Sequence, residues 1–275
     1  MLFILLGLIQ GLTEFFPVSS SGHLVIAKYL LRLRLPGVAF EAFLHFGTVV
    51  AVIVLYNKDI KELLISFLKS IYQLCRGENM SDIFRNDSSS KLTWFLGIST
   101  IPAAIIGYAF DSYFEILFAK PIITSFMLVI TGILLWLGNK YYVGNGKNIL
   151  EITYRDAIII GVAQAIAILP GISRSGFTII AGLSRNLDRK FAAKYSFILS
   201  IPIILGASIF KIKELSSLNI DLTILVLSGL AAAISSYSAM KIFIGLLINK
   251  KIYFFSYYLW IVSGLTIYMS FKRGF

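Results

Sequence analysis

The chain has 275 residues, of which 57% are apolar and 14% charged, and its mean hydropathy is +0.83. This composition excludes an ordinary soluble domain and predicts an all-α integral membrane protein with helices of about 20 apolar residues. The net charge of +11 does not indicate a nucleic-acid partner, because Lys and Arg fall between apolar segments, as the positive-inside rule describes. We expect membrane lipids as partners, and the single cysteine, Cys75, excludes an intrachain disulfide.

Apolar segments predict six membrane-spanning helices. They are residues 40–56, 92–110, 121–138, 191–210, 222–247 and 252–271. Segments 2–35 and 152–185 carry Pro, Gly and Ser near their middle, and we expect each to form a re-entrant hairpin. The first of these opens the chain but lacks a basic region and a cleavage site, so it is interpreted as mature structure rather than a signal peptide. Segment 57–91 predicts an interfacial amphipathic helix over about 60–75 and then a polar loop.

The two hairpins resemble copies of each other. Gly7 to His23 reads G-L-I-Q-G-L-T-E-F-F-P-V-S-S-S-G-H, and Gly161 to Thr178 reads G-V-A-Q-A-I-A-I-L-P-G-I-S-R-S-G-F-T. A shift of 154 positions aligns them without a gap. Each hairpin is followed by three spans, and three is odd, so the second copy must be inverted. We therefore predict one membrane domain, 1–275, made of repeat 1 (1–140) and inverted repeat 2 (150–275), with the binding site where the hairpins meet.

The distribution of basic residues predicts the orientation. The loops assigned to one side of the membrane hold 14 Lys and Arg, and those assigned to the other side hold 8. The richer side should be cytoplasmic. The N-terminal hairpin then opens to the outer, periplasmic face.

The first hairpin carries an acid, a run of serines and a histidine. Glu14 is costly at bilayer depth and needs a partner. Gln10 lies one helical turn earlier, so the two could offer oxygen ligands to a divalent cation, whereas a purely structural Glu14 would pair with another helix or with Arg174. The serines and free amides after Pro17 could cradle a phosphate. These tip residues are Ser19, Ser20, Ser21 and His23.

His23 lies three residues after Ser20 and could serve as its general base, or as an acid to a leaving group. We expect Ser20 to be the nucleophile, with a water activated by the histidine or by the metal as the alternative. The second hairpin supplies Arg174, a guanidinium suited to a bidentate phosphate clamp. Its neighbouring hydroxyls are Ser173, Ser175 and Thr178.

Four other polar residues in apolar surroundings are weaker candidates. Glu41 opens a span and is left open between a site role and a structural role. Gln164 has no acid at the position matching Glu14, so we expect it to be structural. His45 is expected to be a buried, hydrogen-bonded histidine. Lys241 is expected to snorkel to the interface or to hold helices together.

At these residues the chain resembles a known family, the bacitracin-resistance type of undecaprenyl-diphosphate phosphatases. Q-G-L-T-E-F-F-P-V-S-S-S-G-H matches the family's [EQ]-x-x-x-E and P-V-S-S-x-G-H signature, and P-G-I-S-R-S-G-F-T matches P-G-x-S-R-S-x-x-T. Gln10 stands where many members have Glu. The acid-phosphatase type of lipid phosphatase is rejected, because its histidine six residues after the arginine is Ile180 here.

The resemblance implies hydrolysis of undecaprenyl diphosphate to the monophosphate, which recycles the cell-wall lipid carrier, with a divalent cation, Mg²⁺ or Ca²⁺. It implies catalytic roles for Glu14, Ser20, His23 and Arg174, and a bacterial plasma-membrane location. A polyprenyl diphosphate lipid is then the partner, and a homodimer is left open. The rival class is a lipid-phosphate transporter or flippase, since inverted repeats with broken helices also build transporters.

Overall fold

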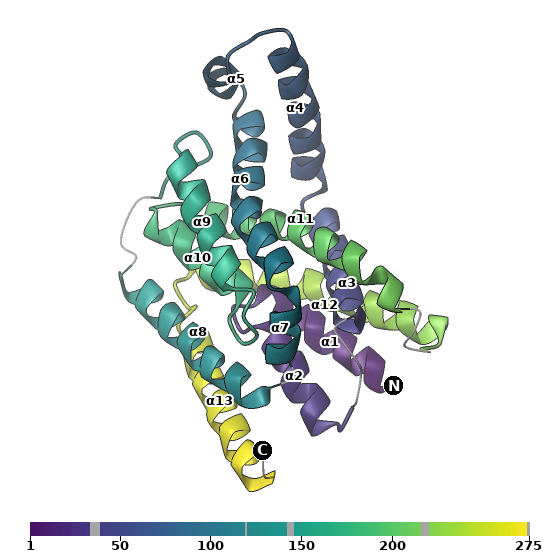
Figure 1. The fold of residues 1–275 in the computed structure, drawn as a ribbon. Helices are drawn as coiled ribbons and strands as arrows, with labels where there is room; N and C mark the ends of the chain where they lie inside the picture. Colours follow the sequence, from purple (N-terminus) through teal and green to yellow (C-terminus); the bar gives the residue numbers. More distant parts are fainter. Residues whose placement is uncertain (34–38, 119, 142–145, 216–219, 274–275) are drawn as a thin grey trace.

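The structure is a computed structural model that describes residues 1–33, 39–118, 120–141, 146–215 and 220–273 (Figure 1). The described residues form helices and their connections, with a single isolated bridge between Lys147 and Leu187. The helices are α1 (Leu2–Phe15), α2 (Ser20–Leu30), α3 (Ala39–Leu55), α4 (Asn57–Cys75), α5 (Met80–Asn86), α6 (Ser88–Ala109), α7 (Asp111–Phe118), α8 (Pro121–Tyr141), α9 (Tyr154–Ile166), α10 (Arg174–Ser184), α11 (Arg189–Leu215), α12 (Leu222–Ile248) and α13 (Phe254–Arg273).

Five of the six predicted spans are confirmed as long apolar helices. These are α6, α8, α11, α12 and α13. The sixth, 40–56, is α3, which has only 17 residues and reaches the length of a span only together with α4. The two helices meet at an angle of 89°, where the apolar sequence gives way to the charged start of α4.

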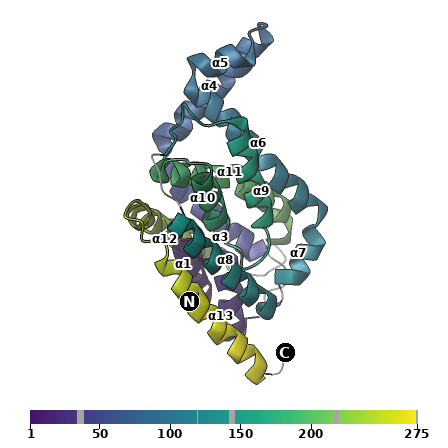
Figure 2. The same ribbon diagram turned by 90° about the vertical axis from the view of Figure 1, so that its left-hand side faces the viewer.

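The amphipathic helix is present as α4, but it does not stand alone. It packs lengthwise on the first half of α6, where Ser90 Oγ donates to the Ser66 carbonyl at 2.9 Å and Trp94 Nε1 donates to Ser70 Oγ at 3.0 Å. The predicted polar loop contains α5, and the unit of α4, α5 and the start of α6 extends away from the other helices (Figures 1 and 2). Cys75 is exposed at the end of α4.

Both predicted hairpins are helix–tip–helix units, α1–α2 and α9–α10. Residues 34 and 35, the predicted end of the first, lie outside the described residues. The second helices, α2 and α10, each have 11 residues and begin with the same cap. Ser19 Oγ accepts from the Gly22 amide at 3.2 Å, and Ser173 Oγ accepts from the Gly176 amide at 3.1 Å. Capping serines of this kind fix where a helix begins.

The C-terminal ends of α2 and α10 also match. Leu33 N–H bonds the Lys28 carbonyl at 2.9 Å, and Leu187 N–H bonds the Gly182 carbonyl at 3.0 Å. The residues before them, Arg32 and Asn186, both have left-handed backbone, with φ of 55° and 63°. All these pairs are related by the 154-residue shift seen in the sequence.

Glycines let each hairpin pack closely on a long helix. A Cβ on Gly7 would lie 2.2 Å from the Ser228 carbonyl oxygen of α12, and one on Gly161 would lie 2.8 Å from the Ser99 carbonyl oxygen of α6. Small residues at such contacts are typical of helix packing in membranes. Because α1 rests on α12 and α9 rests on α6, each hairpin is packed against a span from the other half of the chain.

Candidate active site between the two hairpin tips

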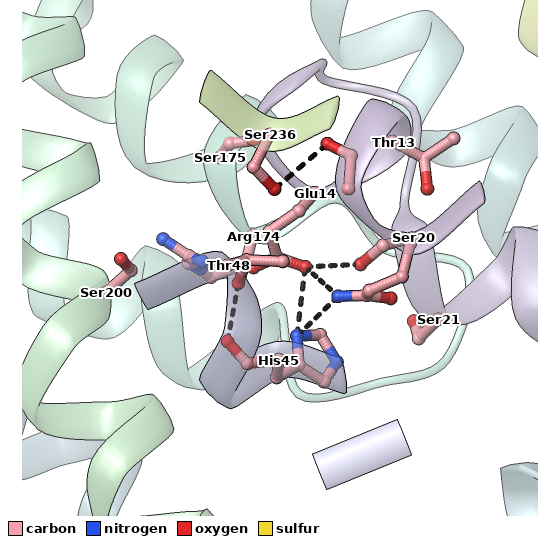
Figure 3. A network of polar contacts seen from close by, with 12 residues as sticks. Thr13, Glu14, Ser20, Ser21, His45, Thr48, Arg174, Ser175, Ser200 and Ser236 are labelled. Atoms are coloured by element: carbon pink, nitrogen blue, oxygen red, sulfur yellow. Dashed lines mark hydrogen bonds and ion pairs between the residues drawn. The ribbon is translucent and has the colours of Figure 1, made fainter. Parts of the chain in front are cut away.

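Glu14, on the last turn of α1, is the centre of a buried polar network, and its side chain is 4% exposed. Its Oε2 accepts from Ser20 Oγ at 2.6 Å and from Gln10 Nε2 at 2.8 Å, and it lies 3.0 Å from His45 Nδ1. Its Oε1 accepts from Arg174 Nη2 at 2.5 Å. The partners come from α1, α2, α3 and α10, so both hairpins and helix α3 converge on this carboxylate (Figure 3).

Arg174 is the first residue of α10 and reaches across to the first hairpin. Besides its bond to Glu14, Nη1 donates to the Ser196 carbonyl at 3.3 Å, and the guanidinium lies 6.0 Å from the centre of the Phe15 ring. Thr178 supports this arrangement through a 2.6 Å bond between its hydroxyl and that of Ser196. The sequence left open whether Glu14 and Arg174 pair, and the structure shows that they do.

The two hairpin tips, 17–23 and 170–176, touch each other. Ser175 Oγ donates to the Phe16 carbonyl at 3.2 Å, and a Cβ on Gly176 would lie 3.2 Å from Pro17 Cβ. Within each tip two hydroxyls are bonded at 3.2 Å, Ser19 with Ser21 and Ser173 with Ser175. The sequence-based expectation that the two polar segments meet is therefore confirmed by their contacts.

The expected pairing of His23 with Ser20 is wrong for this structure. Ser20 turns toward Glu14, whereas His23 lies one helical turn on and faces away. Its Nδ1 lies 2.9 Å from the Ser19 carbonyl oxygen, and its Nε2 lies 2.7 Å from the Tyr258 hydroxyl. Within the described residues, the hydrogen-bond partner of Ser20 Oγ is Glu14 alone.

Two residues of this region were not expected from the sequence. His45 is hydrogen-bonded, as expected, but its side chain is 26% exposed and contacts Glu14 and the Gln10 amide nitrogen, the latter at 2.7 Å. An ionisable residue inside an apolar span is itself a signal for a site, and His45 carries that signal in the sequence. Tyr258 gave no such signal, because it is one of several aromatic residues at the start of α13.

The other three weaker candidates contact residues outside the network around Glu14. Glu41 forms an ion pair with Lys28. Gln164 donates to the Ser99 carbonyl at 3.2 Å between α9 and α6, a structural contact as expected. The Lys241 ammonium lies 4.3 Å from the centre of the Tyr237 ring one turn earlier on α12.

The donor set around Glu14 fits a cation that takes part of its shell from a substrate. Gln10 is fully buried, and its Oε1 has no hydrogen-bond partner among the described residues. Side chains of His, Cys, Asp and Glu do not gather in groups of three or more that could hold a metal within the described part of the chain. One carboxylate, one amide oxygen and substrate phosphates are a typical arrangement for Mg²⁺.

The site borders on two apolar regions. Phe15, whose ring faces the Arg174 guanidinium, packs edge-to-face on Phe197 with ring centres 5.0 Å apart. Beside it, a groove of about 460 Å³ lies between α1, α2 and α13. Its lining is mainly aliphatic. The residues with polar groups are Thr13, His23, Tyr29, Tyr258 and Thr266. Such a groove suits an apolar chain attached to a polar head.

Sequence comparison identifies the family. The profile of the family described as bacitracin resistance protein BacA matches residues 3–265. The chain belongs to this family. A relative from Methanobrevibacter smithii is 40% identical over 269 residues, which cover 97% of this chain and 96% of the relative. Relatives from Halothermothrix orenii (40% over 270 residues, 97% and 96% covered) and Alkaliphilus metalliredigens (38% over 271 residues, 97% of both) are similar in extent.

All three relatives carry the name undecaprenyl-diphosphatase. The family membership that the two motifs indicated is confirmed over nearly the whole chain. Membership in the BacA family and the five long apolar helices together make this chain a multi-pass membrane protein.

Proposed function

We propose that the protein is a membrane phosphatase that hydrolyses undecaprenyl diphosphate to undecaprenyl phosphate and inorganic phosphate. The observation that carries the proposal is the Arg174–Glu14–Ser20 arrangement, buried where two serine-rich tips meet. It joins a phosphate-binding cation, an acceptor for a proton and a nucleophile in one place. The reaction would regenerate the lipid carrier for cell-wall synthesis, which accounts for bacitracin resistance as the family trait.

The terminal phosphate would bind between the tips. Its charge competes with Glu14 for the guanidinium of Arg174, whose planar fork matches two phosphate oxygens. The hydroxyls and amides of the helix starts at Ser19 and Ser173 add donors, as helix N-termini commonly do for phosphate. Ser21, Ser175 and Thr178 complete this set. Substrate binding and the loss of the Glu14–Arg174 bond are then one event.

Ser20 is our choice of nucleophile, and the contact with Glu14 replaces the expected one with His23. Its Oγ would attack the terminal phosphorus while Glu14 Oε2 takes the hydroxyl proton across the present 2.6 Å bond. The bond from phosphorus to the bridging oxygen breaks, and undecaprenyl phosphate leaves. Water then attacks the phosphoserine, the bond between phosphorus and Ser20 Oγ breaks, Oγ takes its proton back from Glu14, and inorganic phosphate leaves. A water attacking directly remains the alternative.

His23 would act at the other end of the diphosphate. It lines the groove between α1, α2 and α13, and the groove could take the first part of the prenyl chain. The chain would then leave sideways between helices into the lipid. There His23 would hold the phosphate that stays attached to the lipid.

Gln10 and Glu14 would hold a divalent cation, Mg²⁺ or Ca²⁺. When bound, such an ion offsets the charge of the phosphoryl group during transfer. Gln10→Glu adds a charged oxygen ligand, and Gln10→Leu removes the oxygen. We expect the Mg²⁺ concentration for half-maximal activity to fall at least about 10-fold in the first and to rise by a similar factor in the second.

The check is a Mg²⁺ titration of phosphate release after EDTA treatment, with Gln73→Glu on α4 as the control for added charge. Gln73 lies on the protruding α4 and bonds Glu78, so its variant should titrate like the wild type. Unchanged Mg²⁺ dependence in both Gln10 variants, or full turnover in EDTA, would remove the cation from this position.

The chain is further proposed to be an inverted repeat, 1–140 and 150–275, in one domain. The matching caps and ends of α2 and α10 and the crossed packing of α1 on α12 and α9 on α6 support this. The inverted repeat and the unequal distribution of basic residues between the two sides together argue for a site open to the outer face of a bacterial plasma membrane.

This orientation can be tested with the one native cysteine. In intact cells, exposed Cys75 of the wild type should not react with a membrane-impermeant maleimide until lysis, because α4 would be cytoplasmic. A Ser21→Cys variant in a Cys75→Ser background should react without lysis. The opposite pattern would reverse the topology and leave the chemistry of the site as it is.

A further inference from the structure

His23 is held in one tautomer by its two neighbours. Its Nδ1 lies 2.9 Å from the carbonyl oxygen of Ser19, and a carbonyl oxygen can only accept. Nδ1 must therefore carry the hydrogen. In the neutral ring Nε2 is then an acceptor with a free lone pair, since the hydrogen bond at one nitrogen sets the state of the other.

Tyr258, near the start of α13, supplies the matching donor. Its hydroxyl lies 2.7 Å from His23 Nε2, so the O–H donates to the lone pair. The two rings are parallel within 6°, with centres 5.6 Å apart. The contact joins residues 235 positions apart, and within the described residues it is the hydrogen bond of the Tyr258 hydroxyl.

The pair sits where the proposed substrate changes from polar to apolar. His23 and Tyr258 both line the groove of about 460 Å³ between α1, α2 and α13. Thr13, which precedes Glu14, lines the same groove. A diphosphate at the tips with its prenyl chain in this groove would bring its lipid-linked phosphate to Nε2.

We infer that Tyr258 is a positioning residue of this site, an inference that rests on the proposed phosphatase function. It keeps His23 in the Nδ1–H tautomer and holds Nε2 at the wall of the groove. When that nitrogen takes a proton from solvent, it can no longer accept from Tyr258. The tyrosine hydrogen then turns away, and the Tyr258 oxygen and the lipid-linked phosphate share the new N–H, while Nδ1–H stays anchored on Ser19. In the other tautomer the free lone pair would face the Ser19 carbonyl, and the ring would have to turn.

The test uses Tyr258→Phe, which keeps the ring and removes the hydroxyl. The chain has two histidines, so protein labelled with ¹⁵N only in histidine gives four ring nitrogen signals, and a His45→Gln sample assigns them. At about pH 8, above the ordinary histidine pKa of about 6.5, the wild type should show His23 protonated at Nδ1. Tyr258→Phe should shift the population toward Nε2–H.

The same variant should lose about 10-fold in kcat, with KM within about two-fold of the wild type. An acid–base group contributes about 100-fold or more to the rate, and Tyr258→Phe disturbs only the placement of His23. Tyr257→Phe is the matched control. Tyr257 packs edge-to-face on Trp260 and should leave both the spectrum and kcat unchanged.

An unchanged tautomer in Tyr258→Phe, or a shifted tautomer with unchanged kcat, would overturn the inference. Failure of the proposed function gives a different result. In that case the wild type itself would release no phosphate from undecaprenyl diphosphate.

Discussion

Replacing Arg174 with lysine should reduce turnover by at least about 100-fold. Lysine keeps the positive charge that Glu14 needs, so the buried site stays neutralised and the protein should fold. It loses the planar fork that matches two phosphate oxygens. In other enzymes, removal of one hydrogen-bond donor to a charge that develops in the transition state lowers kcat about 100- to 1,000-fold, and we expect a loss of that size here.

The measurement is kcat for phosphate release, with Arg185→Lys as a control. Arg185 follows the last residue of α10 and pairs with Asp156 at 2.8 Å. Replacing its planar guanidinium by the ammonium of lysine should therefore cost little activity. Arg174→Ala is a weaker test, because an unpaired buried Glu14 would destabilise the fold by about 3–5 kcal/mol. Turnover of Arg174→Lys within a few-fold of the wild type would refute the clamp.

Ser20→Ala should reduce turnover to the uncatalysed background. The change removes the oxygen that would bond to phosphorus, and Glu14 keeps three of its four partners. In the wild type, rapid acid quench with substrate labelled in the terminal phosphate should trap labelled phosphate on Ser20. Ser125→Ala is the matched control, since Ser125 is also buried and its hydroxyl donates within α8, to the Pro121 carbonyl at 2.9 Å.

The competing mechanism gives the opposite outcome. If a water attacks phosphorus directly, Ser20→Ala should retain measurable turnover and the wild type should carry no label. A His23→Ala variant cannot decide between these mechanisms, because His23 acts on the lipid-linked phosphate in both.

Much of the site could be predicted because the chain repeats itself. The 154-residue shift placed Ser19 opposite Ser173 and Ser21 opposite Ser175, and the structure gives both pairs the same hydrogen bonds. The cost of burying Glu14 called for a cation, and Arg174 provides it. These conclusions needed only periodicity, burial and charge.

The contacts of His23 could not be predicted in the same way. Spacing places Ser20 and His23 on one turn, but their directions depend on what α1 and α13 present to that turn. Glu14 attracts the serine, and Tyr258 and the Ser19 carbonyl hold the histidine. His45 reaches the site from α3 for a similar reason, since only the packing of α3 against α1 brings it to Glu14.

The fold also has features that the sequence predicts and features that depend on packing between segments. Hydropathy predicted the long helices within a few residues, because apolar length alone decides a span. It did not predict the 89° bend between α3 and α4, or that α4 would pack on α6, since these depend on contacts between segments.

The most direct test gives purified protein in detergent undecaprenyl diphosphate labelled in its terminal phosphate. We predict that one labelled inorganic phosphate is released for each lipid converted to the monophosphate, and that Arg174→Lys and Ser20→Ala both lose this release. A wild-type protein that binds the lipid, or moves it across a vesicle membrane with both phosphates in place, would contradict a phosphatase and favour a transporter.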